Sequence, residues 1–235
     1  MSLNKEILPE YPKTIHLPWK PNTSRGDLVA TEKECKLLFN YRHIRVDEKI
    51  DGANCGMVLY EEHPQIRNKD HILRKGYFKN TPAKQQFKSV WNWFYEHKDN
   101  FEKLNEIGKY SVYGDWMYAQ HGLEYDLLPS LFMCYDLYDY DKEKWLDSHV
   151  AKEILIRCGF SIVPELHSGV IENWQMLEKL ANQPSQFTTK GNREGIYLKV
   201  IDDKWIIKRF KMVREGFVQG GLWNKKEIKR NKVMK

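Results

Sequence analysis

The chain has 235 residues, of which 41% are hydrophobic and 30% charged, and 38 basic against 32 acidic residues give a net charge of +6. This length allows a sizeable buried core, and the composition is typical of a soluble globular protein. No apolar run approaches the roughly 20 residues needed to cross a bilayer, and the N-terminus lacks the apolar segment of a secretory signal. We therefore expect a cytoplasmic protein with no membrane partner.

The four cysteines are Cys35, Cys55, Cys134 and Cys158. They form no C-x-x-C pair and have no histidine at the spacing of a metal ligand. The sequence predicts reduced core thiols and no zinc site.

The first half of the chain predicts strands followed by a long helix. The segment 43–62 alternates in hydrophobicity on either side of Asp51-Gly52 and predicts two strands, and 66–75 predicts a short strand and a loop. Apolar residues recur at spacings of three, four and seven from Ala83 to about Ile107, which predicts one amphipathic helix that begins after Thr81-Pro82 and ends near Gly108. These apolar residues are Phe87, Val90, Trp91, Phe94, Phe101 and Leu104. At helical spacing, Trp91 and Phe94 are expected in the core rather than on a base-stacking surface.

The second half predicts two more pairs of strands and two helices. Strands are expected at 110–118 and 130–140, joined by a loop that ends in Pro129. A helix at 147–160 would be capped by Asp147 or Ser148 and stopped by Gly159. A short strand at 161–166, a helix at 172–182, and a hairpin at 194–213 with Asp202-Asp203 at its turn complete the pattern. With no repeat or flexible linker, we expect one α+β domain of mainly antiparallel sheets flanked by helices.

Lys49 lies in the sequence Lys-Ile-Asp-Gly. A lysine amine is a nucleophile only when neutral, and its ordinary pKa of about 10.4 leaves almost none neutral at pH 7. If the segment is extended, Asp51 lies on the same face as Lys49, and Gly52 would let the backbone approach a ligand closely. The alternative is a surface charge beside an ordinary hairpin corner.

Further segments follow Lys49 in a fixed order, and together they resemble the covalent nucleotidyltransferases, the superfamily of ATP-dependent DNA and RNA ligases and mRNA capping enzymes. The resemblance extends from about residue 45 to 217. The part from 112 to 139 has the form seen in the type-two RNA ligases of phages and their relatives, with Asp115 where glutamate is more common. The segments are EKIDGAN, IRNKD, VYGDWMYAQHGLEYDLLPSLFMCYDLYD, EGIYLKV and IIKRFK.

The resemblance implies an ATP-grasp-like nucleotidyltransferase domain that acts as an ATP-dependent RNA ligase. Such an enzyme joins 5′-phosphate and 3′-hydroxyl RNA ends through a covalent lysyl-adenylate and an adenylylated 5′-end. It uses ATP and Mg²⁺ or Mn²⁺, and it works in the cytoplasm or inside a virus-infected host cell. A monomer is compatible with this reading, and the oligomeric state stays open.

The resemblance also implies roles for individual residues. Lys49 would be the covalent nucleophile, Arg67 would hold the ribose or the RNA 5′-phosphate, and Asp115 and Glu194 would bind the metal or the ribose hydroxyls. The expected catalytic set is Lys49, Arg67, Glu194 and Lys211. The expected nucleotide-binding set is Glu48, Lys49, Ile50, Asp51, Arg67, Asp115, Asp136, Glu194, Lys199, Arg209 and Lys211.

Local sequence leaves some assignments open. Strict alternation places Glu194 and Lys199 on opposite faces of a strand. The basic pair could be drawn from Lys208, Arg209 and Lys211, and an arginine could bind phosphate without ever donating a proton. Tyr135 and Tyr138 are both candidates to stack on adenine, and Asp136 could simply satisfy a buried strand end. His121 lies in a loop with no partner at metal spacing, so it could serve structure or touch substrate.

Two other functions compete with RNA ligation. About 18 residues follow Phe217 as a basic tail, too few for the OB-fold that DNA ligases and capping enzymes usually carry. A minimal DNA ligase remains possible, as does a non-catalytic nucleotide- or RNA-binding module on the same fold. The tail, from about residue 218, would either be a solvated charged end or help to bind the RNA strand.

Overall fold

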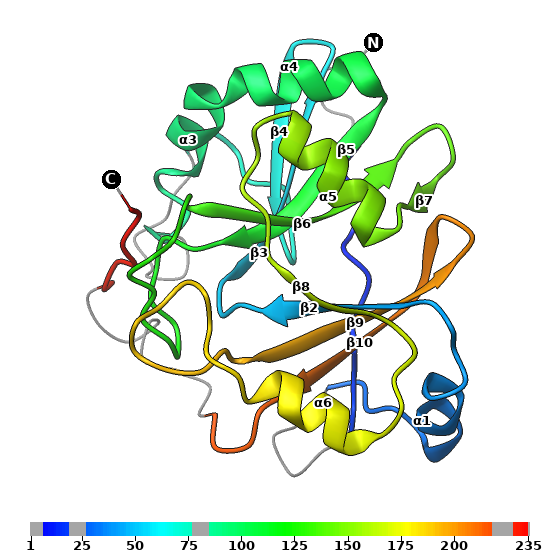
Figure 1. Cartoon of the computed structure of the whole chain (residues 1–235). Helices are drawn as coiled ribbons and strands as arrows, with labels where there is room; N and C mark the ends of the chain where they lie inside the picture. Colours follow the sequence, from blue (N-terminus) through cyan, green and yellow to red (C-terminus); the bar gives the residue numbers. More distant parts are fainter. Residues whose placement is uncertain (1–6, 19–26, 77–84, 218–227, 235) are drawn as a thin grey trace.

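The computed structural model describes residues 7–18, 27–76, 85–217 and 228–234. Two five-stranded sheets face one another, and helices cover the outer face of each sheet (Figure 1). The expected α+β architecture with mainly antiparallel strands is confirmed.

The first sheet has the strand order β1-β10-β9-β2-β8. All its pairs are antiparallel except β1 with β10, which is parallel. On β9, alternate side chains enter an apolar layer against the helices, and those between them face the other sheet. The strands are β1 (Ile15–His16), β2 (Ile44–Lys49), β8 (Glu165–Gly169), β9 (Gly195–Asp202) and β10 (Trp205–Val213).

The second sheet has the order β4-β3-β5-β6-β7 and is antiparallel throughout. Its outer face contributes to a large apolar cluster with the helices above it. The strands are β3 (Ala53–Tyr60), β4 (His63–Asn68), β5 (Tyr110–Trp116), β6 (Phe132–Asp139) and β7 (Lys144–Trp145).

Among the described helices, α1, α5 and α6 start at side-chain caps. The Thr31 hydroxyl accepts from the amide of Glu34, whose carboxylate in turn accepts from the Thr31 amide, which is a capping box. Asp147, one of the two expected caps, accepts from the amide of His149 at the start of α5, and Gly159 follows this helix with a φ of +88°. The helices are α1 (Glu32–Leu38), α3 (Val90–Glu96), α4 (Lys98–Ile107), α5 (Ser148–Arg157) and α6 (Trp174–Ala181).

The single helix expected from Ala83 to Ile107 is wrong, because the chain forms two helices, α3 and α4. His97 separates them with non-helical dihedrals (φ −117°, ψ 21°), and its ring stacks on Trp93 at 4.2 Å between centroids. The expected core residues of this region are all buried. Thr81, Pro82 and Ala83, the expected start, lie outside the described residues.

Two other expectations need correction. The strands on either side of Asp51-Gly52 exist, but β2 pairs in one sheet and β3 in the other, so they are not a hairpin. The strand expected at 161–166 begins later, at Glu165, and pairs with β2. Local alternation gives the face of a strand but not the sheet to which it belongs, so neither result could be read from the segment alone.

The two ends of the described chain lie against the body of the protein. Residues 7–17 run past both sheets and end in β1 (Figure 1). Residues 228–234 pair with the segment 117–128 through two isolated bridges. A freely solvated tail is therefore wrong for 228–234; residues 218–227 lie outside the described part.

All four cysteines are buried and free, as expected for reduced thiols. None of the helices in the described ranges combines the length and apolar character needed to span a membrane.

Candidate active site

A cleft of about 650 Å³ opens between the two sheets, which is within the usual size range of ligand sites. Its walls combine cations, carboxylates and aromatic rings from β2, β5, β6, β9 and β10 with part of the N-terminal segment. A second hollow, of about 710 Å³, lies beside α1 and α6, but its lining has no such cluster of carboxylates around a buried lysine. The cleft between the sheets is the better candidate site.

Lys49 is the last residue of β2, and it faces this cleft. The pairing of Lys49 with Gly195 places Glu194, which directly precedes β9, beside the amine. Nζ of Lys49 lies 2.5 Å from Oε2 of Glu194, and the two side chains are only 13% and 3% exposed. The ring of Tyr197 lies 5.4 Å from the same amine. A buried cation and carboxylate in contact form the centre of the site.

Burial and mutual charge shift the pKa values of this cluster. Burial raises the pKa of Glu194 to about 7 against the lowering effect of Lys49, and burial likewise raises the pKa of Asp115 to about 7. For Lys49, burial favours the neutral amine, but Glu194, Tyr197 and Asp51 outweigh it, so its pKa is raised. Without further ligands, the cleft therefore keeps Lys49 protonated.

Asp51 and Gly52 pack and hydrogen-bond the backbone that follows Lys49 against neighbouring segments. The Asp51 carboxylate accepts hydrogen bonds from the amides of Gly122 and Leu123, while its own amide donates to the Tyr125 hydroxyl. A Cβ on Gly52 would lie 2.4 Å from Sδ of Met117. The direction in which a Gly52 side chain would point is therefore filled by β5 and the residue that follows β5, while Gly52 itself lines the cleft, where its backbone could approach a ligand.

A β-bulge turns two consecutive residues of β6 toward the other sheet. Tyr113 pairs with Asp136 and Gly114 with Cys134, so Tyr135 is the extra residue. Both Tyr135 and Asp136 then project into the space between the sheets, which simple alternation would forbid. Tyr135 lines the cleft, where its hydroxyl accepts from the Asn54 amide.

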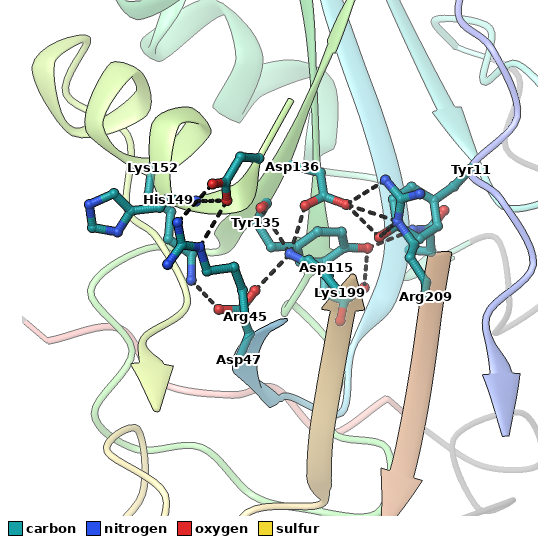
Figure 2. A network of polar contacts seen from close by, with 12 residues as sticks. Tyr11, Arg45, Asp47, Asp115, Tyr135, Asp136, His149, Lys152, Lys199 and Arg209 are labelled. Atoms are coloured by element: carbon teal, nitrogen blue, oxygen red, sulfur yellow. Dashed lines mark hydrogen bonds and ion pairs between the residues drawn. The ribbon is translucent and has the colours of Figure 1, made fainter. Parts of the chain in front are cut away.

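Asp136 lies at the centre of a buried ionic network rather than in the cleft (Figure 2). Its Oδ1 accepts from Lys199 at 2.6 Å, and its Oδ2 accepts from Arg209 at 3.1 Å and from the hydroxyl of Tyr11 at 2.7 Å. Lys199 also donates to Asp47, which in turn binds Lys152. Lys199 and Arg209 are therefore paired with carboxylates between the sheets and are absent from the cleft lining among the described residues.

The three candidate cations of β10 have different surroundings. Lys211 lines the cleft, and its nearest carboxylate oxygen is Oδ1 of Asp27 at 3.6 Å. Burial lowers the pKa of Lys211. Lys208 projects to the opposite face and donates to Glu34 of α1 at 2.7 Å. Arg209 and Lys211 share a face, as expected, but only Lys211 reaches the cleft.

The remaining expected site residues lie beside the cleft or on its far side. Arg67 is buried and donates to the backbone carbonyl of Leu8 at 3.0 Å, so it holds the N-terminal segment. Glu48 projects away from Lys49 toward Arg193, with 3.9 Å between Oε2 and Nε. Ile50 packs in the apolar cluster between the sheets. None of these three is among the cleft-lining residues of the described chain.

Several cleft residues escaped the sequence analysis. Tyr197 lies two residues before Lys199 on the same strand face, so alternation could have identified it. Asn54, at the end of the Lys49 segment, carried a similar local signal. Tyr11 had none, because it reaches the network across 125 positions of sequence. Of the two candidate stacking residues, Tyr135 lines the cleft, whereas Tyr138 packs on Tyr140 and Trp145.

Asp115 and Glu194 are the donors in the cleft that fit a divalent cation. Both line it, both are buried, and both have raised pKa values that a nearby cation would relieve. Among the residues that the structure describes, no three or more His, Cys, Asp or Glu side chains form a group that could hold a metal ion by themselves. Mg²⁺ normally takes one or two carboxylates and completes its shell with water and phosphate oxygens, so two such donors are sufficient.

The chain matches the family model described as RNA ligase over residues 42–213. Solved structures of an RNA ligase from Naegleria gruberi share its fold. The form with PPi has a TM-score of 0.61 at 19% identity, covering 92% of this chain and 61% of that one. A mutant with ATP and Mn has a TM-score of 0.58 at 17% identity, covering 79% and 53%. This chain thus spans a little over half the length of those ligases. No curated protein matches the sequence.

Proposed function

Because the chain belongs to the RNA ligase family, we propose that it is an ATP-dependent RNA ligase that joins 5′-phosphate and 3′-hydroxyl ends. The reaction runs through an adenylate carried on Lys49 and then on the RNA 5′-end. The observation that supports this most is the buried contact between Lys49 and Glu194 inside a cleft that four further carboxylates and Lys211 also line.

The first step forms a bond between Nζ of Lys49 and the α-phosphorus of ATP, while the bond to pyrophosphate breaks. Lys49 must lose a proton before it attacks, and Glu194, in contact with it, can take that proton while no cation holds the carboxylate. A pKa of about 7 lets Glu194 accept a proton near neutral pH. The residues of the cleft thus provide the nucleophile and its proton acceptor.

Positioning and charge stabilisation account for the rest of the chemistry, as is usual for phosphoryl transfer. Lys211 supplies a cation on the same side of the cleft as Lys49, suited to the α-phosphate. Mg²⁺ held by Asp115 and Glu194 would supply positive charge that offsets the phosphate oxygens and favours the neutral amine. Tyr135 and Tyr197 offer aromatic faces for a purine.

RNA is proposed to lie along the edge of the cleft formed by residues 117–123 and the C-terminal residues 228–234. Lys229, Arg230 and Lys232 are exposed there, and the backbone of Lys229 accepts a hydrogen bond from Gln120, next to the cleft residue His121. Three fixed cations beside the site suit the phosphates of a single strand.

Incubation with α-³²P-labelled ATP and Mg²⁺ tests the first step. Wild-type protein should acquire a covalent label that survives denaturation. Lys49→Ala should fold and acquire none, and Lys49→Arg should also fail because a guanidinium keeps its proton. Lys208→Ala, on the opposite face of the same sheet, is the matched control and should label normally. An unlabelled wild type would favour the non-catalytic nucleotide- or RNA-binding module.

The choice between RNA and DNA requires the sealing step. Matched nicked duplexes with RNA or DNA on each side of the nick, together with single-stranded RNA, should be sealed when the 3′-hydroxyl strand is RNA. Sealing confined to an all-DNA 3′-strand would identify a minimal DNA ligase instead.

A further inference from the structure

The C-terminal residues 228–234, here called the C-terminal clasp, pair with the segment that follows β5. The amide of Gln120 donates to the carbonyl of Lys229, and the amide of Lys232 donates to the carbonyl of Tyr125. Isolated bridges join Ala119 to Arg230 and Leu128 to Val233. Residues 228–234 are thus hydrogen-bonded to the backbone of a segment more than 100 positions earlier in the sequence.

Asn231 is the buried residue of the clasp, at 7% exposure, among exposed neighbours. Its Oδ1 accepts from the amide of Tyr125 at 2.9 Å, and its Nδ2 donates to the carbonyls of Met117 at 2.8 Å and Ala119 at 3.2 Å. One side chain therefore satisfies three backbone groups on both limbs of the loop. Since buried backbone groups need partners, the loop conformation depends on this amide.

The same loop holds the backbone beside the nucleophile. Two of its amides, at Gly122 and Leu123, donate to the carboxylate of Asp51, and the Tyr125 hydroxyl accepts from the amide of Asp51. Asp51 is two residues from Lys49. Hydrogen bonds thus connect Asn231 to the loop and the loop to Asp51, and the covalent backbone connects Asp51 to Lys49 two residues earlier.

We propose that Asn231 is a positioning residue for adenylate transfer: the C-terminal clasp orders residues 117–125, and this loop sets the position of Lys49 through Asp51. The proposal rests on the function proposed above for Lys49. It assigns to the C-terminus a role in the first chemical step, separate from any contact that its lysines make with RNA. Asn231 itself need not touch ATP.

The test compares Asn231→Ala with the wild type in single-turnover labelling by α-³²P-ATP over a range of ATP concentrations. Misplacing a nucleophile by about 1 Å can cost on the order of 100-fold in rate. We expect the rate constant at saturating ATP to fall by about 10- to 100-fold, while the ATP concentration for half-maximal rate changes by less than about threefold. Hydrogen exchange should become faster in peptides covering 117–125.

Asn173→Ala is the matched control, because Asn173 is also an asparagine whose Oδ1 accepts a backbone amide, at the start of α6 on the far side of the other sheet. It should lose stability without changing the labelling rate constant. If Asn231→Ala does not fold, Asn231→Ser, which keeps one hydrogen-bonding atom, is measured in the same two ways.

A labelling rate constant that is unchanged in the Asn231 variant, or reduced equally by Asn173→Ala, would overturn the proposal. A wild type that takes up no label would overturn the proposed function instead. In that case unchanged exchange of 117–125 in Asn231→Ala would still refute the ordering role of the clasp.

Discussion

Asp115→Asn should make the protein more stable and at the same time inactive. Burial raises the pKa of Asp115 from 3.8 to about 7, so the folded protein disfavours the ionised carboxylate. Each pKa unit corresponds to about 1.4 kcal/mol, so ionising this group in the folded state costs about 4 kcal/mol as an upper limit. Asparagine keeps the shape and can still accept from the Tyr135 hydroxyl, 3.4 Å away.

The pH dependence follows from the sign of the shift. Below about pH 4 the carboxyl is protonated in both the folded and the unfolded chain, so Asp115→Asn changes little. Between about pH 4 and pH 7 the unfolded chain loses this proton and the folded protein keeps it, so the stability of the wild type declines relative to that of the variant. Above about pH 7 the carboxyl is ionised in both states, so the stability advantage of Asp115→Asn has reached its full value.

Calorimetry in EDTA measures the effect. For a chain of this size 1 kcal/mol corresponds to about 2–4 °C in Tm, so the gain at pH 8 should be at most about 8–16 °C and should shrink toward pH 4. Adenylylation with Mg²⁺ should be lost, because the amide is a poor substitute for an anionic metal ligand. Asp126→Asn is the control: the side-chain and backbone hydrogen bonds from Thr189 lower the pKa of Asp126, so this variant should gain nothing. A Tm for Asp115→Asn at or below that of the wild type at pH 8 would refute the reasoning.

Three further substitutions test other parts of the site. Lys211→Ala should reduce the labelling rate by about 100-fold or more, because it removes a preorganised cation, whereas Lys208→Ala should stay within a factor of two; equal losses would contradict the assignment. Gly52→Ala should destabilise the protein by about 1–3 kcal/mol in urea unfolding, because the new Cβ would press on Met117, and an unchanged midpoint would show that the space is open. Tyr11→Phe should cost about 1–3 kcal/mol by leaving a buried carboxylate and guanidinium short of a partner, and equal stability would show that water replaces the hydroxyl.

The elements that sequence predicted best are those specified by neighbouring residues. The hairpin of β9 and β10 formed where its two acidic turn residues indicated, and Asp147 capped α5. Asp203 adopts the positive φ of 55° that a tight turn requires. The partition of β2 and β3 between two sheets was out of reach, because it depends on partners more than 50 residues away, such as Asp115 opposite Asn54.

In the site, too, features set by neighbouring residues could be predicted, and features set by distant partners could not. Alternation correctly placed Arg209 and Lys211 on one face, yet could not tell which of them a carboxylate would neutralise. That outcome depends on Asp136, 73 positions from Arg209, and on a bulge that lets Tyr135 and Asp136 face the same way. Bulges have no reliable signal in a single strand, and a single aspartate gives no indication of its distant partner.

The charges of the cleft suggest why adenylation would wait for the nucleotide. With Glu194 in contact, the pKa of Lys49 is raised, so the proposed nucleophile stays protonated while the cleft contains only protein charges. Asp115 and Glu194 ionise near neutral pH, which leaves both able to bind a cation at little further cost. A cation arriving with the phosphates would compete with Lys49 for Glu194 and lower the pKa of the amine. Glu194, which holds the lysine protonated, would thus release it only when a metal-bound triphosphate is present, which links the proposed reactivity to the correct substrate.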